Sequence, residues 1–115
     1  MASAVATLSG TLKLLSDPVR LRLCALLGRA ELAVHELVAI TGLQQSRVSN
    51  HLSRLKRAGF VRDRREGTWS FHSLAEASPT GPLTPALYAA TIGPSLASDE
   101  GQRDALDRKS TRLNS

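Results

Sequence analysis

Two short helical patterns joined by one glycine restrict the fold of this chain more than any other feature of its sequence. The first pattern predicts a helix over residues 34–41. Gly42 follows as the turn residue, because glycine enters the left-handed backbone region at little cost. Two helices joined this closely cross steeply over a shared core, which leaves the outer face of the second helix exposed. That second helix is expected from Gln44 or Gln45 to Ala58, with an inward stripe of Val48, Leu52, Leu55 and Ala58.

Two earlier helices are predicted by apolar spacing and by a turn. They are expected over about residues 4–15 and 18–28. Pro18 begins the second of them, because its missing N–H is not needed in the first turn of a helix. This helix is expected to turn its leucines inward and its first two arginines outward: Leu23, Leu26 and Leu27 against Arg20 and Arg22.

A β-hairpin and a last helix complete the pattern. Strands over residues 60–65 and 68–74 flank a tight turn at Glu66-Gly67. Alternation of aromatic and polar residues along the second strand predicts a buried aromatic face and a solvent-exposed polar face. A final helix over about 85–96 is expected to be interrupted at Gly93-Pro94. The order of four helices, two strands and a helix is that of a mainly α-helical winged helix-turn-helix fold, with the hairpin as its wing. The wing's expected buried residues are Trp69 and Phe71, and its wet ones Ser70 and His72.

Positive charge is concentrated between residues 44 and 72. This segment has seven cationic side chains against Asp63 and Glu66, so its local charge equals the +5 of the whole 115-residue chain. A concentrated basic stretch indicates a polyanionic partner. The single cysteine, Cys24, excludes an intramolecular disulfide and suits a small core position.

The outer face of the helix after Gly42 carries side chains that read base edges in double-stranded DNA. Arginine pairs with guanine, glutamine or asparagine with adenine, and serine with several bases. Arg47 is expected to make the most specific contact, and Lys56 and Arg57 to touch phosphates. The predicted DNA-binding residues are Gln45, Ser46, Arg47, Ser49, Asn50, His51 and Arg54 on the helix, and Arg62, Arg64 and Arg65 on the wing.

Several segments between residues 8 and 74 together resemble one family. They are Leu15-Ser-Asp-Pro-Val-Arg-Leu-Arg-Leu23, Glu31-Leu-Ala-Val-His-Glu-Leu37, Thr41-Gly-Leu-Gln-Gln-Ser-Arg-Val-Ser-Asn-His-Leu52, Leu55-Lys-Arg-Ala-Gly-Phe-Val61 and Arg65-Glu-Gly-Thr-Trp69. This combination resembles the ArsR/SmtB transcriptional repressors. The resemblance implies a homodimer, joined through the first and last helices, that binds a palindromic operator and represses transcription. The implied dimer surface comprises Leu8, Leu12, Leu15, Leu83, Leu87 and Tyr88.

The metal sites of that family are not matched here. Where thiolate members have Cys-Val-Cys, this chain has Ala33-Val34-His35, and residues 83–98 contain no histidine. The three histidines, His35, His51 and His72, have no ligand spacing, so no metal or cofactor is predicted and the inducer stays unknown. No phosphate loop, nucleophile elbow or paired carboxylates are found, so the domain is predicted not to be an enzyme.

The expected winged-helix domain covers residues 1–98, and 99–106 begin a linker or tail. Residues 107–115 resemble the translation of a common sequencing adapter, beginning GATCGGAAGAGCACACGTCTG, and are expected not to be native. If the gene was cut short at this point, a second function is open, because some relatives carry a methyltransferase domain after the winged helix. This chain is then the regulatory N-terminal module of an S-adenosylmethionine-dependent methyltransferase whose catalytic domain is missing.

A third interpretation is a winged helix that makes only protein contacts, for which neutralising Arg47 and Arg54 leaves binding intact. The N-terminus has no signal-peptide pattern, and no apolar run approaches the length of a membrane span. We therefore expect a cytoplasmic protein.

Overall fold

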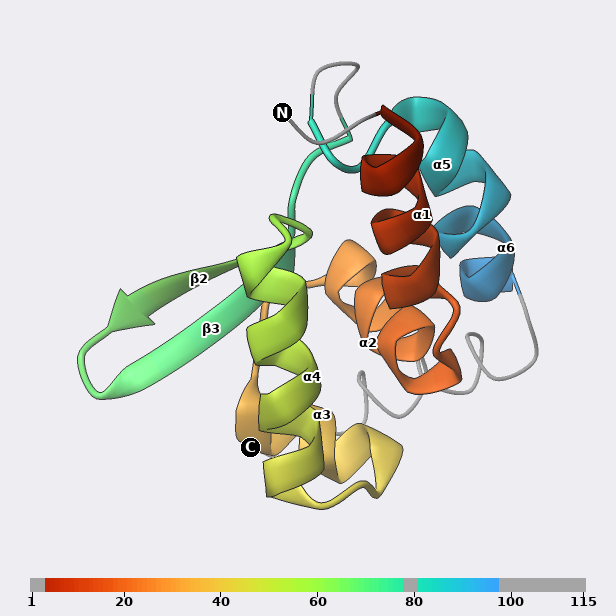
Figure 1. Ribbon diagram of the computed structural model, residues 1–115. Helices are drawn as coiled ribbons and strands as arrows, with labels where there is room; N and C mark the ends of the chain where they lie inside the picture. Colours follow the sequence, from red (N-terminus) through yellow and green to blue (C-terminus); the bar gives the residue numbers. More distant parts are fainter. Residues whose placement is uncertain (1–3, 78–80, 98–115) are drawn as a thin grey trace.

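The computed structural model describes residues 4–77 and 81–97 (Figure 1). The predicted linker at 99–106 and the adapter-like segment at 107–115 lie outside the described residues. In chain order the elements are α1 Ala4–Leu15, α2 Pro18–Arg29, β1 Leu32–Ala33, α3 Val34–Thr41, α4 Gln45–Arg57, β2 Val61–Glu66, β3 Trp69–Leu74, α5 Pro85–Ala90 and α6 Ile92–Ala97.

Local chemistry accounts for the start of α2 and for the predicted glycine turn. The Asp17 carboxylate accepts hydrogen bonds from the backbone N–H groups of Val19, at 2.8 Å, and Arg20, at 3.2 Å, so it caps α2. Gly42 has a φ of 72° and donates its N–H to Val38 O at 2.9 Å, which ends α3 as predicted. Gly67, with a φ of 62°, lies between β2 and β3.

The core lies where α2 meets the other elements. The middle of α2 is fully covered, and α4 adds its predicted inward leucines and valine. Among the most buried side chains are Leu23, Leu26, Leu32, Leu37, Val48, Leu55, Phe60, Leu83 and Ile92. Ala58, predicted as the last inward residue of α4, is exposed, because the helix ends at Arg57 and Phe60 fills the core beyond it.

The sheet contains a strand that the sequence pattern did not indicate. Its order is β1-β3-β2, with both pairings antiparallel. Leu32 lies opposite His72, and Ala33 lies opposite Phe71. A strand of two residues is too short to show alternation, so its only signal is the partner strand far along the chain. This pairing attaches the base of the hairpin to the helical body.

The predicted burial of the hairpin faces is wrong. Trp69 is 54% exposed, and Phe71 is only half-buried. Ser70 and His72, predicted to face solvent, are equally half-buried and line a cavity beneath α4. The hairpin projects away from the helices (Figure 1), so an aromatic residue near its tip has no core to pack against. The aromatic face packs locally instead: the rings of Trp69 and His35 have centroids 4.8 Å apart.

The last helix is broken, but earlier than predicted. It ends at Ala90 and a second helix begins at Ile92. Pro94 lacks the N–H that would bond to Ala90 O in a continuous helix, and its ring would clash with that carbonyl. The break therefore occurs at Thr91, which places Pro94 in the first turn of α6, where no N–H is required.

Candidate nucleic-acid interface

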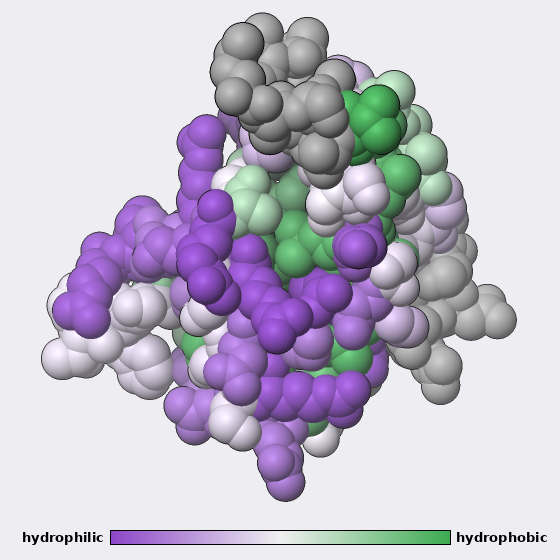
Figure 2. Space-filling model, viewed as in Figure 1, coloured by the Kyte–Doolittle hydropathy of each residue, from purple (hydrophilic) through white to green (hydrophobic). Residues whose placement is uncertain are grey.

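One side of α4 is buried and the opposite side is open. Val48, Leu52 and Leu55 are at most 3% exposed. Because an α-helix repeats every 3.6 residues, these three residues lie on one face, and the residues on the opposite face of α4 point outward. Of the predicted DNA-binding residues on α4, Gln45, Ser46, Arg47, Asn50 and Arg54 are exposed, and Ser49 and His51 are half-buried. The face of the molecule over α4 and the hairpin is mainly hydrophilic (Figure 2).

The turn before α4 is held by Thr41, a residue that the sequence pattern did not single out. Its hydroxyl donates to Leu37 O at 2.7 Å and accepts from the N–H of Leu43 at 3.3 Å. Together with Gly42, these bonds fix the angle at which α4 leaves α3. A threonine directly before a helix-ending glycine is the local signal that could have indicated this role.

Two of the residues predicted to contact DNA, Lys56 and Arg64, form ion pairs within the chain. Lys56 Nζ lies 2.7 Å from Asp63 Oδ2. Arg64 lies 2.7 Å from Glu31 Oε1 and 3.0 Å from Glu66 Oε2, with its guanidinium 5.3 Å from the centre of the Phe71 ring. Sequence spacing could not indicate the pair with Glu31, because the two residues are 33 positions apart.

The two other wing arginines lack such partners. Arg62 and Arg65 are exposed on β2, and neither pairs with an acidic residue in the part of the chain that the structure describes. They are therefore the wing cations available to a polyanion.

A polar cluster joins the start of α2 to α4. Arg20, predicted to face solvent, has a side chain only 11% exposed. Its Nε donates to Leu14 O at 2.6 Å, and its Nη1 lies 3.3 Å from His51 Nδ1. Burial lowers the pKa of His51, and the nearby cations Arg20, Arg47 and Arg54 lower it further against the opposing effect of Asp17. These effects favour the neutral form of His51.

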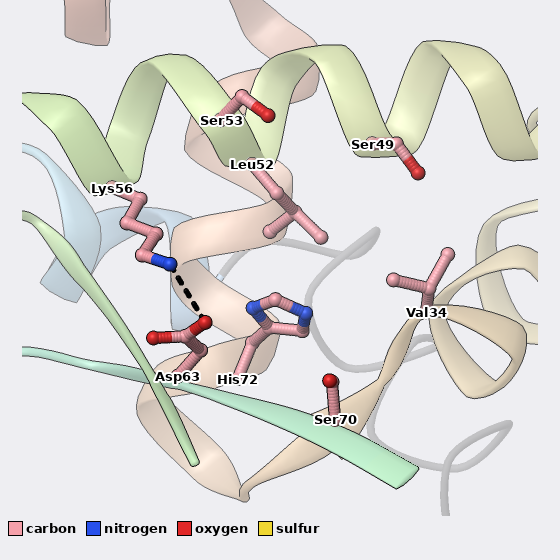
Figure 3. Close-up of a pocket in the computed structure, with 8 residues that line it drawn as sticks. All are labelled: Val34, Ser49, Leu52, Ser53, Lys56, Asp63, Ser70 and His72. Atoms are coloured by element: carbon pink, nitrogen blue, oxygen red, sulfur yellow. Dashed lines mark hydrogen bonds and ion pairs between the residues drawn. The ribbon is translucent and has the colours of Figure 1, made fainter. Parts of the chain in front are cut away.

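A small cleft separates α4 from the hairpin (Figure 3). Its volume is about 240 Å³, and the Lys56–Asp63 ion pair crosses one end of it. Nδ1 of His72 is buried there without a hydrogen-bond partner among the described residues, and burial lowers the pKa of this imidazole. The lining residues are Val34, Ser49, Leu52, Ser53, Lys56, Asp63, Ser70 and His72.

The predicted dimer residues divide into two groups. Leu8 and Leu12 on α1 are 55% and 49% exposed, and Val5, which was not predicted, is 76% exposed. By contrast, Leu15 and Leu83 are buried within the chain itself, so their side chains are closed to a partner. Leu87 and Tyr88 on α5 are half-buried.

Within residues 4–77 and 81–97, no three His, Cys, Asp or Glu side chains gather closely enough to hold a metal ion. Cys24 is fully buried, and burial raises the pKa of its thiol to about 12. No helix in these ranges combines the length and the apolar character needed to cross a membrane.

Known proteins share this architecture. HlyU from Vibrio cholerae superposes with a TM-score of 0.66 at 29% identity, covering 84% of this chain and 96% of HlyU. The homodimeric winged helix-turn-helix DNA-binding domain of Mb0332 from Mycobacterium bovis gives 0.63 at 25% identity, covering 87% and 92%. These structures confirm the predicted winged helix-turn-helix fold.

Relatives in sequence are regulators. The biofilm growth-associated repressor of Agrobacterium fabrum is 40% identical over 83 residues, which are 72% of this chain and 70% of that protein. The arsenical resistance operon repressor of Escherichia coli is 30% identical over 103 residues, 89% and 83% of the two chains. An arsenic resistance transcriptional regulator of Pseudomonas putida is 41% identical over 63 residues, so the match spans about half of that relative (49%).

A family model described as "Bacterial regulatory protein, arsR family" matches residues 17–63, a segment that contains α2, α3 and α4. The resemblance noted in the sequence is thereby confirmed. Since relatives also align over most of both chains at 30–40% identity, this chain belongs to the arsR family of bacterial transcriptional regulators.

Proposed function

We propose that this protein is a cytoplasmic transcriptional repressor that binds a palindromic operator as a homodimer. The observation that carries the proposal is the row of exposed donors and acceptors on α4, directly opposite a stripe that is buried in the core. A helix anchored on one side and polar on the other fits the major groove. In this arrangement Arg47, in the first turn of α4, contacts a base, and Arg54 contacts the backbone.

The wing supplies the second contact with DNA. Arg62 and Arg65 are exposed and have no acidic partner within residues 4–77 and 81–97, so we assign them to phosphates or to the minor groove. Arg64 is held by Glu31 and Glu66, and we assign it to bracing the wing. This assignment differs from the role expected from the sequence, where all three arginines contact DNA.

The exposed apolar face of α1 supports a dimer. Val5, Leu8 and Leu12 would leave three large apolar side chains in water in a monomer. The related domain of Mb0332 is homodimeric. A two-fold dimer presents two copies of α4 about one DNA turn apart, which requires a palindromic site.

We assign no inducer to this protein. Two relatives are named for arsenic resistance, but the one cysteine of this chain is buried in α2, so we extend no arsenic or metal response to it. The relatives reported above are named as regulators and repressors, which gives no support to the methyltransferase-module alternative. We assign the domain no catalytic activity.

Selection of bound fragments from random double-stranded DNA tests the proposal. We expect a palindromic motif to be enriched at moderate ionic strength. Arg47→Ala should cost about 1–3 kcal/mol on that motif and relax the preference at one base pair in each half-site. The proposal is overturned if no motif is enriched, or if neutralising Arg47 and Arg54 together leaves affinity unchanged, as the protein-contact interpretation requires.

A further inference from the structure

Arg20 lies at the junction of α1, α2 and α4 and is held on several sides. Besides the bond from Nε to Leu14 O at 2.6 Å, its Nη2 donates to Lys13 O at 3.5 Å. Nη1 is thereby directed at His51 Nδ1, 3.3 Å away on α4. Because the Arg20 side chain is only 11% exposed, it has little freedom to leave this position.

The chemistry of the two groups determines where the His51 proton lies. A guanidinium group only donates hydrogen bonds and stays charged at all ordinary pH values. In the contact with Arg20, His51 Nδ1 must therefore act as the acceptor. A neutral imidazole whose Nδ1 is unprotonated carries its single proton on Nε2.

The protonated nitrogen is not enclosed by the described part of the chain. In the part of the chain that the structure describes, the buried side-chain nitrogen without a partner is Nδ1 of His72, not Nε2 of His51. Nε2 of His51 has no hydrogen bond in that part of the chain either, so this atom of the half-buried ring is at least partly exposed to solvent. Arg47 and Arg54, one turn away on either side along α4, are exposed on the same side of the helix. Arg54, which we assign to the DNA backbone, lies beside this N–H donor, and the two together form a surface suited to a phosphate oxygen.

We propose that Arg20 is a positioning residue for DNA binding, which fixes His51 as the Nε2–H tautomer and aims that N–H at the DNA backbone. This inference rests on the proposed function, but its first half concerns the free protein. Arg20 itself does not touch DNA. It acts through the orientation and the tautomer of a side chain that does.

Nuclear magnetic resonance of the DNA-free protein tests the tautomer. In two-bond proton–nitrogen spectra near neutral pH, His51 should show the pattern of the Nε2–H form. In Arg20→Met that pattern should shift towards a mixture of tautomers. Arg29→Met is the matched control, because Arg29 is also on α2 and donates to a backbone carbonyl, Leu96 O, at 2.8 Å. An Nδ1–H pattern in the unmodified protein, or an unchanged pattern in a folded Arg20→Met, overturns the proposal.

Substitution of His51 tests the donor while the bonds from Arg20 to the Leu14 and Lys13 carbonyls remain possible. Glutamine places its amide nitrogen near the position of Nε2, whereas asparagine reaches only the position of Nδ1. On the selected operator, we expect His51→Asn to lose about tenfold in affinity, as for one hydrogen bond to a charged group, and His51→Gln to lose clearly less. Equal losses, or a larger loss in His51→Gln, exclude a donor at Nε2.

The two levels of the proposal fail in different ways. If the unmodified protein enriches no DNA motif, the proposed function fails and so does the DNA contact of His51, whatever the tautomer. If the motif is enriched but His51 is not the Nε2–H tautomer, or His51→Gln loses as much affinity as His51→Asn, DNA binding stands and the role of Arg20 is refuted.

Discussion

Arg64 and Arg65 are neighbours in β2 with opposite surroundings. Arg64 pairs with Glu31 and Glu66, while Arg65 is exposed without a partner among the described residues. We expect Arg65→Met to weaken DNA binding evenly across sequences and to reduce the slope of log affinity against log salt by about one for each half-site. Arg64→Met should change that slope much less. Titrations at several salt concentrations measure both, and an equal effect of the two variants would show that Arg64 leaves its carboxylates to contact phosphate.

We expect His72 to make the stability of the fold depend on pH. Burial lowers its pKa below the ordinary 6.5, and the neighbouring Asp63 only partly opposes this effect. As the pH falls below 6.5, the unfolded chain takes up a proton that the folded chain resists, so the free energy of unfolding decreases. The loss should stop once the pH passes below the pKa of the folded state. Above pH 6.5 His72 is largely neutral in both the folded and the unfolded chain, so it no longer lowers the free energy of unfolding.

Urea unfolding on either side of pH 6.5 measures this dependence. In His72→Gln the decrease in stability on acidification should be smaller than in the unmodified protein. Part of it remains, because the pKa of His51 is lowered in the same direction. His35→Gln, which changes an exposed histidine, is the control for a general effect of substitution. If His72→Gln shows the same acid sensitivity as the unmodified protein, His72 is not the responsible group.

The turn between α3 and α4 depends on a backbone conformation that few residues adopt. A Cβ at Gly42 would meet no atom within 4 Å, so the only cost of alanine there is its φ of 72°. Gly42→Ala should therefore lower the free energy of unfolding by about 1–2 kcal/mol. Gly10 is also surrounded by open space but lies within α1. Gly10→Ala should raise stability by roughly 0.5–1 kcal/mol. Denaturant curves of the two variants should shift in opposite directions, and a shared direction would contradict this explanation.

The helices could be predicted because their signals are local. Apolar spacing and the residues Pro18 and Gly42 indicated α2, α3 and α4 within one or two residues of their observed bounds. The same periodicity indicated which side of α4 is exposed, and with it most of the candidate site. Each of these inferences needs only residues that are close in sequence.

Features that arise from distant pairing could not be predicted. β1 exists because Leu32 and Ala33 meet β3, about 40 positions later. Arg20 was predicted to face solvent, but it contacts His51, which lies 31 positions along the chain. The hairpin faces were assigned wrongly because alternation identifies two faces but does not say which one the helices cover. Only the folded arrangement decides whether an arginine is free for DNA or already paired.

In a dimer of this protein, the apolar face of α1 and the polar face of α4 would both contribute to DNA binding. The surface that covers Val5, Leu8 and Leu12 also sets the distance between two copies of α4. Leu12→Asp places a charge on a 49%-exposed leucine without disturbing the buried core. We expect this variant to be a folded monomer by light scattering, because an unpaired carboxylate cannot be buried at low cost in an apolar interface.

Loss of the dimer should also be visible on DNA. A monomer engages one half-site at a time, so Leu12→Asp should bind the palindrome roughly 100-fold more weakly, yet bind an isolated half-site about as well as the unmodified monomer does. Lys13→Asp adds the same side chain at the neighbouring exposed position of α1, away from the apolar residues, and should remain dimeric. A dimeric Leu12→Asp with full operator affinity would place the subunit interface elsewhere. Weak binding by a variant that is still dimeric would instead mean that α1 influences α4 within one chain, through the Leu14 and Lys13 carbonyls that hold Arg20.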